Sequence, residues 1–380
     1  MLSPAVRNSL GQLYPFGVLF VLSSIITLAM DAAVLGPDAE LPATAIDPTP
    51  AIYAFGILSM GMIGLLIGYV ELYLLNGLFR HRTLVETVVY KLGIYLILMH
   101  LLVALVYPIA AAMEAGRSPL SPEVLERLGG YLVSRTHLST CLQLGTTIAL
   151  AIFYAQIAQH LGHSNLLNFL TGRYHRPREE ARIFLFADMT ASTTIAERIG
   201  HLRYFDLLKD YYDDLSPAIT RHLGEIHEYV GDEVVASWTY REGVHADNCL
   251  RCFIAMRHDL AKRRDYYLER YGLVPTFKAA MHCGRVTTGE IGRTKKQIVF
   301  TGDVLNATAR MLALCGHYKT DLLLSGNIVQ ELSDRATAGI TLLEERKLRG
   351  KDGTVELHTI GTAVQHPSSG RTGHPVATFG

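Results

Sequence analysis

The sequence has little that would support a disulfide framework or binding to nucleic acid. It contains five cysteines in 380 residues, and the closely spaced pair Cys249 and Cys252 has no second pair or suitably spaced histidine to complete a zinc site. Lysine and arginine total 35, and so do aspartate and glutamate, so no net charge attracts a polyanion. We therefore expect no nucleic-acid partner, and we expect Cys249 and Cys252 to pack one face of a helix.

What the chain has instead is an excess of apolar residues near its start. Hydrophobic residues make up 49% of the chain and the mean hydropathy is +0.21, which is high for a soluble protein. Four apolar stretches in residues 1–160 are long enough to cross a bilayer, at about 13–34, 51–75, 93–113 and 137–157. Asp31 and Glu71 fall inside or at the edge of the first two, facing either the bundle interior or the membrane interface.

The charges between these stretches predict the orientation of the chain. Residues 36–50 carry acids but no lysine or arginine, whereas Arg80 and Arg82 lie in the next connection and three arginines lie in residues 173–178. Three arginines in the third connection weaken this asymmetry. A cleavage site at 43–45 would leave the C-terminal half on the same side. The positive-inside rule predicts a multi-pass protein of the inner or plasma membrane, in contact with lipid, with both termini cytoplasmic.

The C-terminal half alternates between strand-like and helical patterns. A linker at 161–181 precedes a domain at 182–362, and the tail at 363–380 has the composition of a disordered segment. The order βαββαβ predicts an α+β sheet of the ferredoxin-like type, with helices on one face. We expect strands near 183–187, 224–230, 233–240, 276–282, 286–290 and 297–301, and helices near 194–222 (kinked at Pro217), 245–271 and 303–315.

Two aspartates in this half are candidate metal ligands. Asp188 ends the first predicted strand, and Asp232 lies in the turn of the predicted hairpin. The first strand and the hairpin are neighbours in such a sheet, so the two carboxylates converge at one edge. Paired carboxylates suit Mg²⁺, which favours oxygen ligands and shares its shell with substrate phosphates. Taken singly, each aspartate is equally explained as a helix cap or a hairpin turn.

A third element strengthens the interpretation of a phosphate site. In the stretch TGDVLNATARM, Asn306 and Arg310 lie four residues apart, on one face of a predicted helix that is otherwise mostly apolar and small. An amide beside a guanidinium on such a helix fits a stripe that faces phosphate. The alternative is an arginine paired with a carboxylate at the edge of the core.

Five motifs in this order resemble the catalytic domain of class III nucleotidyl cyclases. They are FADMTAST, YVGDEVVASW, MHCGRVTTGEIG, FTGDVLNATARM and LRGKDG, and the resemblance covers about residues 182–360. It implies an N-terminal α-helical transmembrane bundle followed by an α+β, ferredoxin-like cyclase catalytic domain. It also implies a homodimer, because the family assembles each active site from two subunits.

The resemblance implies a role for each site residue. Two Mg²⁺ or Mn²⁺ ions would be held by Asp188, Asp232 and the backbone carbonyl of Met189. Asn306 would orient the ribose, and Arg310 would stabilise charge at the α-phosphate. The outer phosphates would be held by the amides of the turn and by a lysine, namely Thr190, Ala191, Ser192, Thr193 and Lys351. The family usually has glycine where this chain has Ala191, and we expect alanine to be tolerated.

The residues at the base-selecting positions match neither purine. Glu228 resembles guanylate cyclases, whereas Val299 offers no side-chain hydrogen bond. By analogy with four-span bacterial members of the family, we predict a membrane-bound adenylate cyclase that converts ATP to 3′,5′-cyclic AMP and pyrophosphate in signal transduction. The first alternative is a guanylate cyclase that acts on GTP. Weaker alternatives are a diguanylate cyclase, suggested by the sequence at 231–233, and a non-catalytic membrane receptor with a cyclase fold.

Overall fold

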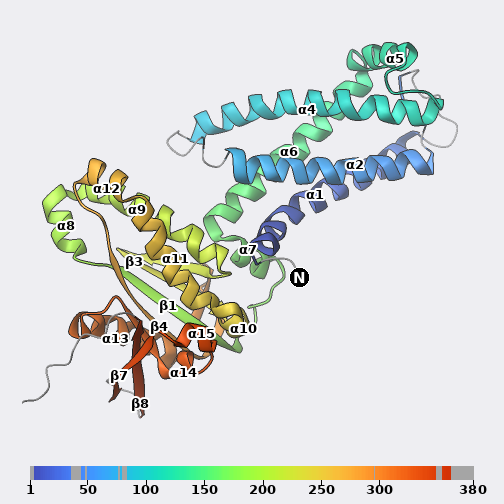
Figure 1. Ribbon diagram of the computed structural model, residues 1–380. Coiled ribbons are helices and arrows are strands. Elements are labelled where there is room, and N and C mark those ends of the chain that lie inside the picture. The colour runs from blue at the N-terminus through green and yellow to red at the C-terminus, as the bar shows by residue number, and fades with distance from the viewer. Residues whose placement is uncertain are drawn as a thin grey trace, which may run out of the picture. The chain divides into compact units, whose positions relative to one another are not determined.

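A computed structural model describes residues 4–35, 44–47, 49–75, 78, 84–294, 296–347 and 353–360 of the chain (Figure 1). Lys351 and the predicted tail at 363–380 lie outside these residues. The described chain divides near residue 167 into two compact units, which are considered one at a time.

The first unit is entirely helical, and four of its helices are long and apolar enough to cross a membrane. The candidate spans are Leu10–Ala33, Pro50–Leu75, Val89–Ala115 and Arg135–Ala158, which confirms the predicted number and identifies a multi-pass membrane protein. The helices of this part of the chain are α1 (Pro4–Leu35), α2 (Pro50–Tyr69), the π-helix η1 (Val70–Leu75), α4 (Leu84–Ala115), α5 (Pro122–Leu132), α6 (Arg135–Leu161) and α7 (His163–Leu170).

Small residues let the first two helices approach closely. A Cβ atom added at Gly64 of α2 would lie 2.7 Å from the carbonyl oxygen of Phe16 in α1, and one added at Gly68 would lie 2.8 Å from the Phe16 ring. Helices in lipid associate through this kind of close packing, because lipid tails are as apolar as the side chains.

Polar groups lie inside this bundle. Glu71, in η1, is fully buried; it is ion-paired with Lys91 of α4 and accepts a hydrogen bond of 2.6 Å from the Tyr95 hydroxyl. Asp31, by contrast, is exposed. Of the two acids noted in the sequence, Glu71 therefore faces the bundle interior and Asp31 does not.

The second unit is built on a mixed sheet in the order β2-β3-β1-β4-β6-β8-β7, with β5 paired to β4. All described pairings are antiparallel except β4 with β6. This confirms the α+β class and the βαββαβ core. The strands are β1 (Arg178–Met189), β2 (Glu225–Val230), β3 (Glu233–Thr239), β4 (Phe277–Ile291), β5 (Gln297–Thr301), β6 (Leu322–Ser325), β7 (Ile340–Lys347) and β8 (Thr354–Ile360).

Helices cover both faces of the sheet, so the predicted one-sided arrangement is wrong. Alternate residues of β1 point to opposite faces. Ile183 and Leu185 pack in one core with the helices α9 (His201–Arg221) and α11 (Asn248–Lys262), while Phe184 packs in another with α13 (Asp303–Tyr318). Cys249 and Cys252 of α11 are buried in the first of these cores, as expected.

Several predicted elements are divided differently in the structure. The helix predicted over 194–222 is broken at Gly200, whose φ of 82° leaves the helical region, and Pro217 lies inside α9. The helix predicted over 245–271 begins instead with a 3₁₀ turn, where Ala246 and Asp247 have positive φ, and it is divided again at Arg263. The strands predicted at 276–282 and 286–290 form one strand, β4. The remaining helices are α8 (Ser192–Ile199), α10 (Tyr240–Val244), η2 (His245–Asp247), α12 (Arg264–Tyr271), α14 (Gly326–Val329) and α15 (Asp334–Thr337).

Candidate active site

The end of β1 brings Asp188 and Asp232 together. Asp188 pairs across the sheet with Glu233, the residue next to Asp232, and the Met189 amide donates to the Asp232 carbonyl at 3.3 Å. The two aspartate side chains lie close enough to interact electrostatically. Burial first, and then Asp232, raises the pKa of Asp188, while Lys278 opposes the rise.

A third carboxylate and one lysine complete this cluster. Glu233 is half-buried, and burial together with Asp188 and Asp232 raises its pKa to about 7. Lys278 Nζ lies 3.2 Å from Asp188 Oδ2. Crowded, partly buried carboxylates repel one another, and a divalent cation relieves that repulsion, so the donor set fits Mg²⁺ or Mn²⁺.

Sequence reasoning missed Lys278. Lys278 lies on β4 directly opposite Asp188 on β1, which makes the two a cross-strand pair. Only the register of these two strands places Lys278 beside Asp188. The two residues are 90 positions apart in the sequence (278 minus 188), so local patterns do not predict their contact.

A tyrosine on α9 holds the hairpin turn that carries Asp232. The Tyr212 hydroxyl donates to the carbonyl of Gly231 at 2.8 Å, and its ring lies 4.3 Å from that of Tyr229 on β2. Gly231 has a φ of 64°, in the left-handed region that favours glycine. The turn is thus fixed from outside as well as by its own sequence, and Tyr212 was also missed by sequence reasoning.

The turn after Asp188 leads directly into α8. Ala191 caps this helix with φ 57° and ψ 31°, a left-handed conformation that favours glycine and that alanine adopts here at some cost. The first amides of a helix lack intrahelical partners and suit phosphate, which fits Ser192 and Thr193. The Thr190 amide instead donates to the carbonyl of Thr276 at 2.8 Å, so it is not available as predicted.

Asn306 and Arg310 lie on the side of α13 that faces away from the sheet. Val304, Ala307 and Met311 are buried against the strands, whereas Asn306 is exposed and Arg310 is half-buried. Arg310 Nη1 is buried without a hydrogen-bond partner among the described residues. Among the residues that the structure describes, no carboxylate forms an ion pair with Arg310, so they do not support the alternative of an arginine paired at the edge of the core.

Asn306 is far from the two aspartates of the same chain. A Cβ atom at Gly284 of β4 would lie 2.6 Å from Val304, so the start of α13 is level with Gly284. Asp188 is level with Lys278, six positions away along β4. At about 3.3 Å per residue, the start of α13 lies about 20 Å from Asp188 along the strands. The helix then runs back towards that end, since Cys315 Sγ donates to the Ala279 carbonyl at 3.4 Å, but Asn306 is only two residues from Val304. One chain therefore brings the aspartates together but does not bring Asn306 to them.

The two positions predicted to select the base lie next to a pair of rings in contact, tilted by 55° to each other. His227 of β2 and Phe300 of β5 have ring centroids 4.4 Å apart, and Glu228 and Val299 are their sequence neighbours. Glu228 is exposed and Val299 is half-buried. The structure thus brings these two positions into one region, although 71 positions separate them (299 minus 228).

Comparison with known proteins agrees with this geometry. Residues 174–362 match the family described as the Adenylate and Guanylate cyclase catalytic domain. This part of the chain belongs to the class III nucleotidyl cyclases, as the sequence motifs predict.

Curated relatives share the same region. Adenylate cyclase 2 of Rhizobium meliloti (strain 1021) is 34% identical over 200 residues, which is 53% of this chain and 55% of the relative. Adenylate cyclase of Anabaena cylindrica is 26% identical over 182 residues, which is 46% of this chain and 36% of the relative. The chain thus spans about half the length of the first of these relatives and about a third of the second. A solved bacterial light-regulated adenylyl cyclase superposes with a TM-score of 0.49 at 19% identity, over 60% of this chain and 65% of that one.

Proposed function

We propose that this protein is a membrane-anchored adenylate cyclase that converts ATP to 3′,5′-cyclic AMP and pyrophosphate in signal transduction. The observation that carries the proposal is the convergence of Asp188 and Asp232 at the end of β1, within a cyclase catalytic domain. The four candidate spans supply the anchor. The charge distribution supports an inner or plasma membrane location with both termini cytoplasmic.

Asp188, Asp232 and the carbonyl of Met189 would hold two Mg²⁺ or Mn²⁺ ions. When bound, such ions neutralise phosphate charge and favour attack by the ribose 3′-oxygen on the α-phosphate. The residues of the chain would hold the nucleotide in position for this attack. The amides of Ala191, Ser192 and Thr193 would bind the outer phosphates together with Lys351.

Asn306 and Arg310 would complete the site from a second copy of the chain. The start of α13, where Asn306 lies, is about 20 Å from Asp188 along the strands of one chain, which is too long for both residues to reach one nucleotide's ribose and phosphates. Arg310 has a buried, unpartnered nitrogen that suits a phosphate oxygen. A homodimer in which each copy donates one set would satisfy both observations.

The choice of ATP rests on the relatives, two of which are named adenylate cyclases. Glu228 favours the alternative, GTP, because a carboxylate can accept from the amino group of guanine. Val299 supplies no matching donor or acceptor. GTP is therefore kept as the second candidate substrate.

Turnover by the full chain in detergent tests the proposal. Purified protein is incubated with Mn²⁺ and either ATP or GTP, beside the Asp188→Ala variant. We expect cyclic AMP from the wild type and none from the variant. Predominant cyclic GMP would show that Glu228 sets the base, and no cyclic product from either nucleotide would overturn the enzymatic function.

Mixing two inactive variants tests the dimer. Asp188→Ala and Arg310→Ala damage different halves of the site, so a heterodimer of the two retains one intact site. We expect each variant alone to be inactive and the co-expressed pair to recover about a quarter of wild-type activity, since half of randomly formed dimers are mixed and each has one of two sites. No recovery in a preparation proven to contain mixed dimers would contradict the shared site.

A further inference from the structure

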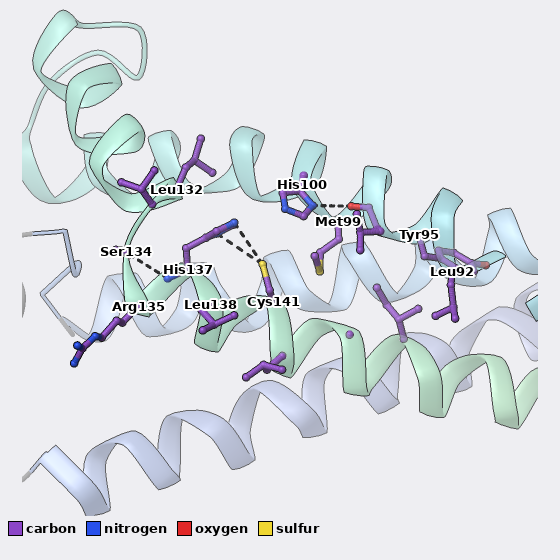
Figure 2. A pocket seen from close by; sticks show the side chains of 15 residues that line it. Leu92, Tyr95, Met99, His100, Leu132, Ser134, Arg135, His137, Leu138 and Cys141 are labelled. Atoms are coloured by element: carbon purple, nitrogen blue, oxygen red, sulfur yellow. Dashed lines mark hydrogen bonds between the residues drawn. The ribbon is translucent and has the colours of Figure 1, made fainter. Parts of the chain in front are cut away.

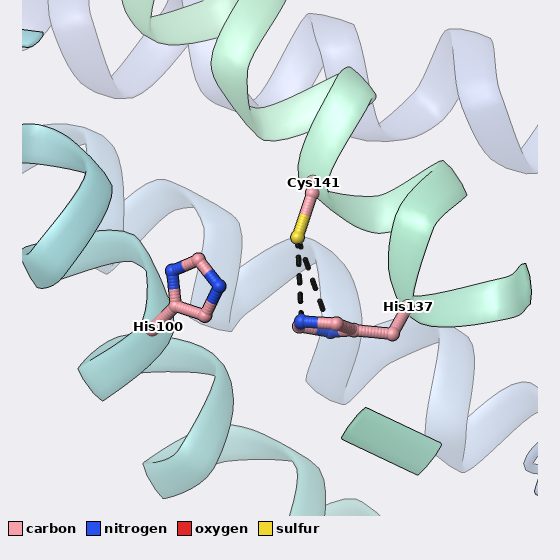
Figure 3. A group of neighbouring side chains, drawn as sticks. All are labelled: His100, His137 and Cys141. Carbon is pink, nitrogen blue, oxygen red and sulfur yellow. Dashed lines mark hydrogen bonds between the residues drawn. The ribbon is translucent and has the colours of Figure 1, made fainter. Parts of the chain in front are cut away.

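Two histidines and a cysteine converge inside the helical unit. His100 lies on α4, while His137 and Cys141 lie one turn apart on α6 (Figure 3). One ligand atom from each lies within 4.8 Å of the other two, and Cys141 Sγ is 3.4 Å from His137 Nε2. None of these residues belongs to the cyclase site.

We propose that His100, His137 and Cys141 bind a Zn²⁺ ion in the helical unit. Imidazole nitrogen and thiolate sulfur are the ligands that Zn²⁺ prefers, whereas the cyclase site offers only oxygen to hard cations. With bonds of about 2.0 Å to nitrogen and about 2.3 Å to sulfur, tetrahedral ligand atoms lie about 3.5 Å apart. The His137–Cys141 separation already has about this value, and His100 needs to approach by about 1.3 Å or less.

A contact behind His100 holds it in a binding orientation, whereas the ring of His137 must turn to bind, because Cys141 Sγ lies near both of its nitrogens, 3.4 Å from Nε2 and 4.0 Å from Nδ1. His100 Nδ1 lies 2.8 Å from the Leu96 carbonyl; because a carbonyl only accepts, Nδ1 carries the hydrogen and Nε2 keeps its lone pair. Metal-binding histidines characteristically have such a second partner. The ring of His137 packs 5.2 Å from that of Tyr131. The backbone amide of His137 donates to Ser134 Oγ at 3.1 Å.

A cavity of about 640 Å³ adjoins the three side chains (Figure 2). It is lined mostly by apolar residues of α4 and α6, including Leu92, Met99, Leu138 and Leu142. These side chains supply no fourth strong ligand, so the fourth position would be filled by water or by a small molecule in the cavity. Three protein ligands with one open position are typical of reactive or exchangeable zinc sites.

The place of the site in the unit suggests what the ion does. At 1.5 Å per residue, Cys141 is about 9 Å along α6 from its first residue, Arg135, and so lies towards one end of that candidate span. Bound Zn²⁺ would join α4 to α6 and fix their relative position. In the proposed orientation this end is on the non-cytoplasmic side, but ion binding in detergent does not depend on that.

The alternative to a zinc site is a hydrogen-bonded pair of His137 and Cys141 on one helix, with His100 nearby and no metal bound. A spectroscopic probe separates the two readings, because Co²⁺ in a zinc site with a thiolate ligand shows a sulfur-to-metal charge-transfer band. Full-length protein in detergent is titrated with Co²⁺ under excess Mg²⁺, which occupies the carboxylates of the cyclase site. We expect one equivalent of Co²⁺ with this band, displaced by Zn²⁺.

Matched variants assign the ligands. Cys141→Ser should abolish the charge-transfer band, and His100→Ala and His137→Ala should each weaken Co²⁺ binding by about 100-fold. His258→Ala, an exposed histidine of α11, and Leu138→Ala, a cavity residue that cannot bind metal, should leave the titration unchanged. Zn²⁺ should also raise the unfolding temperature of the wild type but not of Cys141→Ser.

A wild type without the band, or a band that persists in Cys141→Ser, would overturn the site. Displacement of Co²⁺ by Cu⁺ but not by Zn²⁺ would overturn the assignment of the ion. If the ligand variants and the wild type unfold at the same temperature without metal, a loss of binding reflects lost ligands rather than lost structure. None of these readouts requires cyclase activity, so the result stands apart from the proposed function.

Discussion

The two units of this protein place charge and apolar surface in opposite ways. In the helical unit large apolar side chains lie outside, as in Leu58 and Met62, which are 70% and 72% exposed, and the ion pair of Glu71 with Lys91 lies inside. In the cyclase unit the single tryptophan, Trp238, is fully buried in an apolar core. One physical rule explains both, because each unit turns outward the surface that matches its own solvent.

Among the described residues each unit buries one lysine or arginine, but with different partners. Lys91 is paired with one carboxylate, so the group is neutral overall. Arg182 of β1 is paired with both Glu180 and Glu225, donates to Ser237 at 2.9 Å and lies 4.9 Å from the Phe300 ring. A membrane interior favours a neutral pair, whereas a water-exposed domain tolerates an extra negative charge.

The largest expected effect concerns chemistry in the cyclase unit alone. Asp188→Asn should lower cyclase activity by at least about 100-fold, since it removes a ligand of ions that contribute several kcal/mol to the transition state. Initial rates of cyclic nucleotide formation measure this. The control Glu179→Gln changes an exposed acid at the other end of β1 and should retain full activity. More than a tenth of wild-type activity in Asp188→Asn would contradict the metal assignment.

The next effect should be confined to the helical unit. Glu71→Leu leaves Lys91 buried without its ion-pair partner and should destabilise this unit by about 3–5 kcal/mol, whereas Glu71→Leu with Lys91→Leu should recover most of the loss. Unfolding of the full chain in detergent, followed by far-UV circular dichroism, measures both. Fluorescence reports on the cyclase unit alone, because Trp238 is the single tryptophan, and should be unchanged. A double variant no more stable than the single one would show that the pair does more than neutralise Lys91.

A pH dependence should separate the two units further. Burial, and then the charge of Arg182, lowers the pKa of His227 to about 3. Between pH 6.5 and 3 the unfolded chain therefore binds a proton that the folded chain does not, so stability falls as the pH falls, by about 2 kcal/mol at pH 5. Urea unfolding followed by Trp238 fluorescence measures this slope. His227→Gln should flatten it, and an equally steep slope in that variant would show that another group causes it.

The smallest effect concerns the turn after Asp188. Ala191→Gly relieves a left-handed alanine and should raise the stability of the cyclase unit by up to about 1 kcal/mol, with activity within about twofold of the wild type. Ala191→Val is the matched opposite, because a branched side chain fits positive φ poorly. Urea midpoints of the two variants test this, and equal midpoints would mean that the turn relaxes at no cost.

The parts of the site that the sequence predicted are those that depend on local structure. Asp188 follows a buried strand and Asp232 lies in a two-residue hairpin turn, so a few neighbouring residues place each of them. Glycine and positive φ were harder to read. The sequence predicts a kink at Pro217, whereas the helix breaks at Gly200. An isolated glycine is tolerated within helices, so the sequence does not show which glycine leaves the helical region.

The four apolar helices, the α+β domain and the two aspartates could be predicted from the sequence, because hydrophobic periodicity and turn chemistry act over short stretches. The partners that those elements meet depend on how the chain packs. Lys278 reaches Asp188 through strand register, and Tyr212 reaches the hairpin turn through helix packing. His100 lies near Cys141 only because α4 and α6 pack with these two side chains on the faces that they turn towards each other. Apolar helices look alike on every side in sequence, so packing alone fixes which side chains face each other.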